Sequence, residues 1–225
     1  MGVELQKHID EKVFTIHEEK LRDYLGASAI GHECGRHVQY YWLQLLGRIP
    51  TEMIEPRVRR IFDRGNIYEA EIVKWMKISG FVFEDDNSKL EFSSLEDKFK
   101  GHVDGVLLQG PLPLPYPVLW ECKCVNAKGF ERLVQHGVRV QYPKYYTQVQ
   151  LYMYYLKLDQ CLFTAINAND MSIYDEAVKF NKQHAEEMIS RVEQIFDKTD
   201  KNKFVPKVKS QWNCRFCEYK KYCEE

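Results

Sequence analysis

A strand-like run, Val118-Leu119-Trp120-Glu121-Cys122-Lys123-Cys124, sets a carboxylate and an ammonium group among apolar side chains. Successive side chains of a strand point to opposite faces, so Glu121 and Lys123 share one face and the two cysteines of the run share the other. We expect chemistry on the first face and core packing on the second. A glutamate and a lysine at this spacing occur by chance in most chains of this length, so the run gains meaning from the residues around it.

A second strand is expected over residues 100–108, with Asp104 at its middle. The segment between the two strands, residues 109–117, contains four prolines, which cannot donate backbone hydrogen bonds to a sheet. It should therefore be an extended connector, and the two strands should pair as a hairpin. That pairing would bring Asp104 beside Glu121.

The side chains of Asp104 and Glu121, with the backbone carbonyl of Cys122, offer the oxygen ligands that magnesium and manganese ions prefer. A bound divalent cation activates water and neutralises the charge that develops on an attacked phosphate. Lys123 is placed to hold the attacking water or to stabilise the transition state. The sequence therefore indicates a metal-dependent site for hydrolysing phosphodiesters.

A helix expected from Pro143 to Leu158 adds two polar residues, Gln148 and Tyr152, which stand four residues apart and hence on one helical face. The order Asp, Glu-x-Lys, Gln-x-x-x-Tyr resembles the PD-(D/E)XK nuclease superfamily, in particular its RecB-like branch. The resemblance implies an α/β fold with a mixed central sheet flanked by helices, the restriction-endonuclease-like core.

The same resemblance implies a role for each matched residue. Asp104 and Glu121 would be metal ligands, and Lys123 would be the catalytic lysine. Gln148 and Tyr152 would belong to the catalytic site and border the DNA near the scissile phosphate. The activity implied is that of a DNA exonuclease dependent on magnesium or manganese.

One motif departs from the family pattern. The branch usually carries Gly-x-x-His-Glu on an N-terminal helix, and the corresponding stretch here has Gly65, Tyr68 and Glu69. Tyr68 stands where a metal-binding histidine is expected, and tyrosine is a poor ligand for these ions. Either Glu69 fills the position as a ligand from the helix, or the metal site is more open.

Seven cysteines are present, and three of them form the C-terminal pattern Cys214-x2-Cys217-x5-Cys223. The first thirty residues contain no continuous apolar segment typical of a signal peptide, so we expect a cytoplasmic protein. In a reducing compartment, clustered cysteines indicate metal ligands before disulfides. Four thiolates, counting the distant Cys34, suit either zinc or an iron-sulfur cluster.

The layout of one distant cysteine and three C-terminal cysteines resembles the iron-sulfur staple of AddB-type and CRISPR-associated RecB-like nucleases. The resemblance implies that Cys34, Cys214, Cys217 and Cys223 hold a 4Fe-4S cluster, with zinc as the alternative. The other three cysteines lie in apolar strands and are expected to be small core residues.

Aromatic and basic residues suggest where DNA would lie. Tyr145 and Tyr146, beside Lys144, are candidates for contact with substrate bases and phosphates, and Tyr68 is a further candidate. The stretch from residue 129 to 155 resembles phage-type members of the superfamily. Single-stranded DNA or DNA ends are therefore the expected partner.

The 225 residues carry a net charge of -1, which neither favours nor excludes nucleic-acid binding through a local basic groove. We expect an N-terminal helical segment over residues 1–54, a nuclease core over 55–200 and a cysteine module over 201–225. No apolar stretch approaches the length needed to cross a bilayer.

Two other functions stay open at this point. The chain could be a catalytically inactive protein that binds DNA ends, an alternative supported by Tyr68 alone. It could also be a zinc-bound interaction module, which explains the cysteines but leaves Asp104, Glu121 and Lys123 as coincidence. Similar proteins act with partners in recombination, repair or CRISPR adaptation, and the sequence does not choose among these settings.

Overall fold

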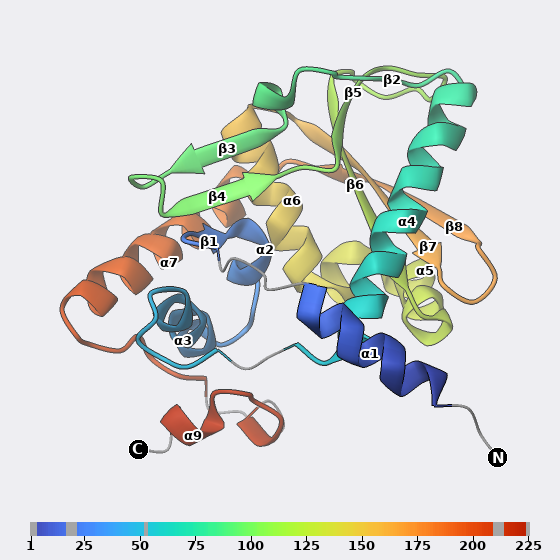
Figure 1. Cartoon of the computed structure of the whole chain (residues 1–225). Coiled ribbons are helices and arrows are strands. Elements are labelled where there is room, and N and C mark those ends of the chain that lie inside the picture. Colours follow the sequence, from blue (N-terminus) through green and yellow to red (C-terminus); the bar gives the residue numbers. More distant parts are fainter. Residues whose placement is uncertain (1–3, 17–21, 52–53, 209–213, 224–225) are drawn as a thin grey trace.

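The computed structural model describes residues 4–16, 22–51, 54–208 and 214–223 (Figure 1). Within them the larger sheet has the strand order β2, β5, β6, β7, β8. Strands β6 and β7 are parallel, and the other neighbours are antiparallel. These strands span, in chain order, Val82–Phe83, Gly105–Gln109, Val118–Val125, Gln160–Asn167 and Ile173–Lys179. The expected α/β class with a mixed central sheet is confirmed.

Two helices cover the two faces of this sheet. The long α4 (Pro56–Ile78) packs its buried Ile72 and Met76 against the face that carries Trp120 and Cys122. The second helix, α6 (Pro143–Leu156), lies on the other face, where Val149 and Met153 enter the main core. The alternation of β6 side chains thus sends Glu121 and Lys123 toward α6 and Cys122 toward α4.

A smaller sheet contains β1 (Leu25–Gly26), β4 (Phe99–His102) and β3 (Glu91–Ser94), with β4 in the middle. A short 3-10 helix, Asn87–Lys89, precedes β3. Strand β4 pairs parallel to β1 and antiparallel to β3. This sheet lies beside the larger one and is separate from it in Figure 1.

The chain crosses from the smaller sheet to the larger one at Asp104, so the expectation of one continuous strand over residues 100–108 was wrong. The amide of Val103 still donates to the carbonyl of Leu90 in the smaller sheet, at 2.9 Å. Gly105 already pairs with Trp120 in the larger sheet. Asp104 therefore lies in a bend between β4 and β5, with both neighbours held by different sheets.

The remaining elements complete the larger sheet. Helix α5 (Ala127–Gln141) connects β6 to α6 and is kinked at Gly137, whose φ of 71° lies in the left-handed region. The amide of Val138, just after the kink, donates to the Glu176 carboxylate of β8 at 2.7 Å. Strands β7 and β8 pair antiparallel as a hairpin whose turn contains Asn169 and Asp170.

The N-terminal and C-terminal parts of the chain pack against each other. Helices α2 (Ala27–Ile30) and α3 (Gly35–Leu45) lie on α6 and on α7 (Lys182–Asp200). Gln39 of α3 is buried and hydrogen-bonds the chain beyond α7, accepting from the Val205 amide at 2.8 Å and donating to the Lys203 carbonyl at 2.8 Å.

Two further helices lie near the chain ends (Figure 1). Helix α1 (Leu5–Ile16) contacts α4, where Asp10 and Arg60 form an ion pair. Helix α9 (Lys220–Cys223) lies near α3, whose Tyr40 hydroxyl donates to the Tyr222 carbonyl at 2.6 Å. Among the described helices, none combines the length and apolar character that a membrane span requires.

Candidate active site

The site is built on an open edge of β6. Strand β6 pairs with β7 from Leu119 to Val125, but it pairs with β5 only from Val118 to Trp120. Beyond Trp120, no described strand covers that edge. The amide of Cys122 points to this edge and donates to Asp104 Oδ2 at 2.8 Å. The carboxylate thus replaces the ladder partner that β5 would have supplied, and the break in the strand at Asp104 creates the site.

Three charged side chains meet at this edge. Lys123 Nζ lies 3.7 Å from Asp104 Oδ2 and forms an ion pair with Glu121 Oε1. Lys123 Nζ also donates to the carbonyl of Cys122 at 3.1 Å. The structure therefore brings together the aspartate, the glutamate, the lysine and the backbone carbonyl that the sequence selects.

Helix α6 fixes the orientation of Glu121. Gln148 Nε2 donates to Glu121 Oε1 at 2.8 Å and lies 2.9 Å from the Tyr152 hydroxyl, as expected for residues on one helical face. Glu121 is fully buried, and its second oxygen, Oε2, has no hydrogen-bond partner among the described residues. A buried carboxylate oxygen without a partner is costly, so it marks a position for a ligand.

The electrostatics of the site agree with this geometry. Burial, and then the charge of Asp104, raise the pKa of Glu121 to about 8. Burial opposes the charge of Lys123, but the carboxylates of Glu121 and Asp104 outweigh that effect and raise the pKa of the lysine. At neutral pH Lys123 is therefore a cation, whereas the raised pKa of Glu121 means that this carboxyl group is mostly protonated beside Asp104.

Glu69 adds a third carboxylate from α4. Burial, and then the charge of Asp104, raise its pKa to about 7, while Lys123 acts in the opposite direction. Glu69 lines a cavity of about 370 Å³ together with Lys123 and Tyr68. Tyr68 and Glu69, the two residues of the helix motif that differs from the family pattern, both lie at the site. Tyr68 forms part of the cavity wall, and Glu69 feels the charges of Asp104 and Lys123.

The oxygen donors at the open edge of β6 suit a divalent cation, although Asp104 and Glu121 lie outside the residues that line this cavity. No group of three or more histidine, cysteine, aspartate or glutamate side chains is arranged to hold a metal ion within the described ranges. However, Asp104, Glu121 and the Cys122 carbonyl present oxygen atoms, which hard cations prefer. The Oε2 of Glu121 has no partner among the described residues, and burial followed by the charge of Asp104 raises the pKa values of Glu121 and Glu69, so a bound cation would favour the ionised form of both groups.

The residues expected to contact substrate divide into two groups. The ring centroid of Tyr145 lies 5.5 Å from Lys123 Nζ, and both residues line the cavity. Tyr146 is buried in the main core and packs against His184, away from this cavity. Lys144 lines a different pocket, near the cysteines.

Other cavity residues were missed by the sequence analysis. Phe62, Gly65 and Asn66 of α4 line the same cavity as Glu69. They precede Glu69 by seven, four and three residues, which places them on one face of a helix. Counting back from Glu69 at helical spacing would have selected them. Cys124 also lines this cavity and is half-buried, so the expectation that it is a core residue was wrong.

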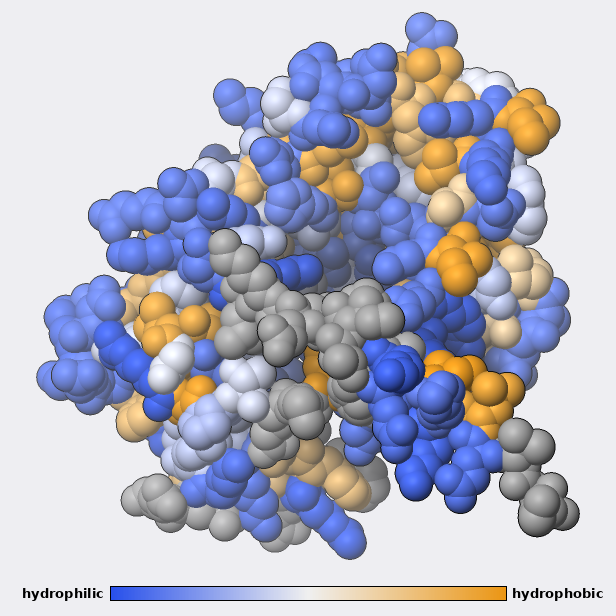
Figure 2. All heavy atoms as spheres, in the orientation of Figure 1, coloured by the Kyte–Doolittle hydropathy of each residue, from blue (hydrophilic) through white to orange (hydrophobic). Residues whose placement is uncertain are grey.

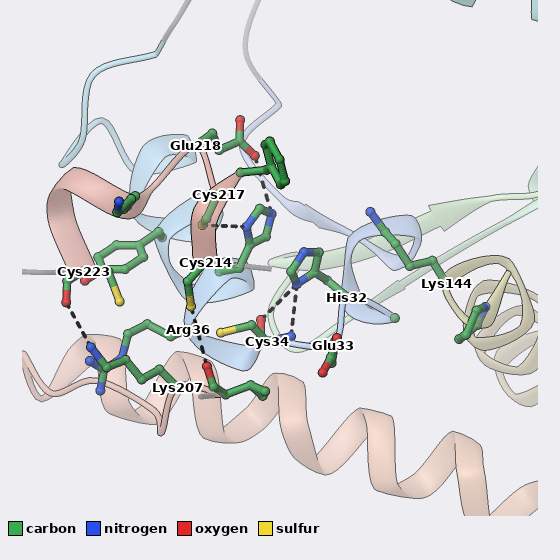
Figure 3. Close-up of a pocket in the computed structure, with 17 residues that line it drawn as sticks. His32, Glu33, Cys34, Arg36, Lys144, Lys207, Cys214, Cys217, Glu218 and Cys223 are labelled. Carbon is green, nitrogen blue, oxygen red and sulfur yellow. Dashed lines mark hydrogen bonds and ion pairs between the residues drawn. The ribbon is translucent and has the colours of Figure 1, made fainter. Parts of the chain in front are cut away.

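The four cysteines selected as cluster ligands line one pocket of about 770 Å³ (Figure 3). Cys34 precedes α3 as its N-cap residue, Cys214 and Cys217 lie before α9, and Cys223 ends it. The figure shows these side chains gathered around the pocket from both ends of the chain.

Two stacked histidines form part of the wall of this pocket. The ring centroids of His32 and His37 lie 3.7 Å apart, and His37 Nδ1 is 3.7 Å from Cys217 Sγ. His37 Nε2 also lies 3.5 Å from Glu218 Oε1. All cysteines of the described residues are free thiols.

Comparison with known proteins gives structural relatives only. No family model matches the sequence, and no curated protein does. The fold is similar to an alkaline exonuclease (LHK-Exo) from Laribacter hongkongensis, with 17% identity, a TM-score of 0.60 and coverage of 85% of this chain and 93% of that chain. A structure of LHK-Exo in complex with dAMP gives a TM-score of 0.58 at 17% identity, over 80% of this chain and 89% of that chain.

A phage-related exonuclease from Haemophilus somnus 129PT is also similar, with 15% identity and a TM-score of 0.51 over 84% of this chain and 99% of that chain. All three structures are of proteins named as exonucleases, and two of them are of LHK-Exo. The open edge of β6 in the present chain carries Asp104, Glu121 and Lys123 in the order of the superfamily motif. The chain therefore has a fold similar to that of these exonuclease structures, including one from a phage-related protein.

Proposed function

We propose that this protein is a metal-dependent DNA exonuclease that hydrolyses phosphodiester bonds at DNA ends. The observation that carries the proposal is the meeting of Asp104, Glu121 and Lys123 at the open edge of β6, with one oxygen of Glu121 buried and unpartnered among the described residues. The exonuclease names of the structural relatives support the same reaction class.

In this proposal Asp104, Glu121 and the Cys122 carbonyl hold magnesium or manganese, and Glu69 completes the set from α4. When bound, the ion supplies a Lewis acid and an activated water. Gln148 keeps Glu121 oriented through its hydrogen bond to Oε1, and Tyr152 supports Gln148. Lys123, which is charged at neutral pH, donates to a phosphate oxygen as negative charge develops there.

Single substitutions at the site test the proposal. We expect Asp104→Asn, Glu121→Gln and Lys123→Met each to lower the rate of DNA digestion by about 100-fold or more, because each removes a ligand or the cation opposite the phosphate. The measurement uses end-labelled single-stranded and double-stranded DNA with magnesium or manganese. Asp175→Asn, an exposed carboxylate on β8, is the control and should leave the rate unchanged.

Far-ultraviolet circular dichroism and a melting curve should show that each variant folds. Undiminished digestion by a folded Asp104→Asn or Glu121→Gln variant would contradict the proposal. Tight binding of DNA ends by the unchanged protein, without turnover in either metal, would instead favour the inactive DNA-binding protein that Tyr68 suggests.

We also propose that Cys34, Cys214, Cys217 and Cys223 hold a structural 4Fe-4S cluster. The supporting observation is that all four thiols line one pocket although Cys34 is far from the others in sequence. Thiolates suit both iron-sulfur clusters and zinc, so the donor set alone leaves zinc as the alternative.

Anaerobic purification tests the identity of the metal. We expect a brown protein with broad visible absorbance and about four iron and four sulfide per chain, as the proposed cluster requires. Cys34→Ser should lose the colour, whereas Cys124→Ser should keep it, because Cys124 lines the other cavity. A colourless protein that contains zinc would contradict the cluster and support a zinc module.

The setting of the reaction is also part of the proposal. A cytoplasmic enzyme, encoded by a bacterium, an archaeon or a phage, would act in recombination, repair or CRISPR adaptation, with or without a protein partner.

A further inference from the structure

One face of α4 leads from the molecular surface into the cavity of about 370 Å³ that Glu69 and Lys123 line, called the catalytic cavity below. Phe62, Gly65, Asn66 and Glu69 all line this cavity, and their spacing of three or four residues places them along one face of the helix. Glu69 is the inner end of this face, where burial and then the charge of Asp104 raise its pKa. Phe62 is the outer end, at the rim.

The rim is unusually apolar for an exposed surface. Phe62 is 53% exposed and its neighbour Ile61, which lines the same cavity, is 42% exposed. Hydrophobic residues stand over α4 in the space-filling view, beside the hollow that separates α4 from β3 and β4 (Figure 2). When a ligand with an apolar face covers the apolar side chains at the mouth of the cavity, the burial favours binding.

The distance along the helix suits a nucleotide. Seven residues separate Phe62 from Glu69, which corresponds to about 10 Å along the helix axis. A DNA strand with a phosphate beside Lys123 and Asp104 would place a neighbouring base within reach of Phe62 at the rim. Gly65 lies between Phe62 and Glu69 on the helix, and open space surrounds the position where its side chain would be. This part of the cavity wall therefore leaves room for the DNA strand.

We propose that Phe62, with Ile61 beside it, is a stacking platform for the base next to the scissile phosphate. Asn66 faces the sugar and phosphate between that base and Glu69. This inference rests on the proposed nuclease function and adds the form of its substrate. A base can lie flat on a phenyl ring only when no other base covers that face, so the nucleotide in the cavity is unstacked on that side, as it is in single-stranded or frayed DNA or at the end of a duplex. Any base offers such a face, so the platform is tolerant of sequence.

Binding without cleavage tests the platform. The probe is a short single-stranded oligonucleotide with 2-aminopurine next to its end, bound by the Asp104→Asn protein in the presence of calcium. We expect binding to quench the 2-aminopurine fluorescence through stacking. Phe62→Leu, made in the same background, should reduce the quenching and weaken binding by about 10-fold or more. Phe62→Tyr should restore both.

Two controls isolate the base contact. Trp75→Leu removes another exposed aromatic residue of α4, 41% exposed and outside the cavity, and should change neither signal. An oligonucleotide with an abasic residue at the probe position should bind equally well to the proteins with and without Phe62→Leu. Both Phe62 variants should melt at the same temperature as the parent, because the ring is exposed.

The outcomes separate this inference from the function on which it rests. Equal quenching and affinity in the Phe62→Leu protein, or an equal loss in the Trp75→Leu protein, would overturn the platform while leaving exonuclease activity intact. Failure of the unchanged enzyme to digest any DNA, with stacking still observed, would instead contradict the nuclease proposal alone.

Discussion

At the scale of single residues, the site keeps groups that stability alone would not favour. Glu121 is buried with one oxygen unpartnered among the described residues, and leaving a buried acceptor unsatisfied costs on the order of 1–3 kcal/mol. Asp104 and Glu69 add negative charge around it, and Lys123 is the nearby cation. Such an arrangement is typical of functional sites, where titratable groups have shifted pKa values.

Glu69 gives a prediction about pH. Because its pKa is raised to about 7, the stability supplied by its protonated form is fully present below pH 4.5 and is lost as the pH rises through 7. Glu69→Gln cannot ionise, so it should become progressively more stable relative to the unchanged protein as the pH rises from 4.5 to about 7. Since Glu69 is only partly buried, we expect a gain of about 1 kcal/mol or less.

Melting curves at pH 6 and pH 8, with and without magnesium, provide the measurement. Magnesium should stabilise the unchanged protein at pH 8 by about 1.4 kcal/mol when present at ten times its Kd, and should stabilise Glu69→Gln less. Glu71→Gln, a neighbour on α4 whose side chain is 40% exposed, is the matched control. A stability difference between Glu69→Gln and the unchanged protein that is the same at both pH values would contradict this account.

At the scale of elements, the sequence predicted helix α6 closely. The helix was expected from Pro143 to Leu158, and it spans Pro143–Leu156 in the structure. The change of sheet at Asp104 escaped prediction because Lys100, His102 and Asp104 keep the alternation of a single strand. The break depends on which strand lies next to each residue, and that is a property of tertiary pairing.

Gly65 supplies a prediction for α4. A glycine inside a helix costs about 0.5–1 kcal/mol relative to alanine, and an added Cβ at this position meets open space. We therefore expect Gly65→Ala to raise the free energy of unfolding by about that amount. It should also lower the digestion rate, because the new methyl group narrows the cavity wall.

Chemical denaturation and the end-labelled digestion assay measure the two effects. Glu71→Ala changes a partly exposed residue of the same helix, outside the cavity, and should alter neither by more than a small amount. Increased stability with an undiminished rate would show that the glycine does not keep space for the substrate.

At the scale of the whole molecule, α6 connects the two pockets. Its first turn carries Lys144 to the cysteine pocket, while Tyr145 and Gln148 reach the catalytic site. The sequence motifs selected Glu69 and Lys123, which line one pocket, and the four cysteines that line the other. They could not predict the polar contacts that join the chain ends, such as Gln39 with Val205, because a single glutamine in an amphipathic helix carries no signal of its distant partner.

The bend at Asp104 has a mechanical consequence for the molecule. Its carboxylate is attached to the seam between two separately hydrogen-bonded sheets, while Glu121 and Lys123 belong wholly to one of them. A small rotation of one sheet against the other would therefore strain the hydrogen bond from the Cys122 amide to Asp104 and move one acidic group relative to the other. The spacing of these acids, and hence their grip on a cation, is set by how rigidly the two sheets are joined.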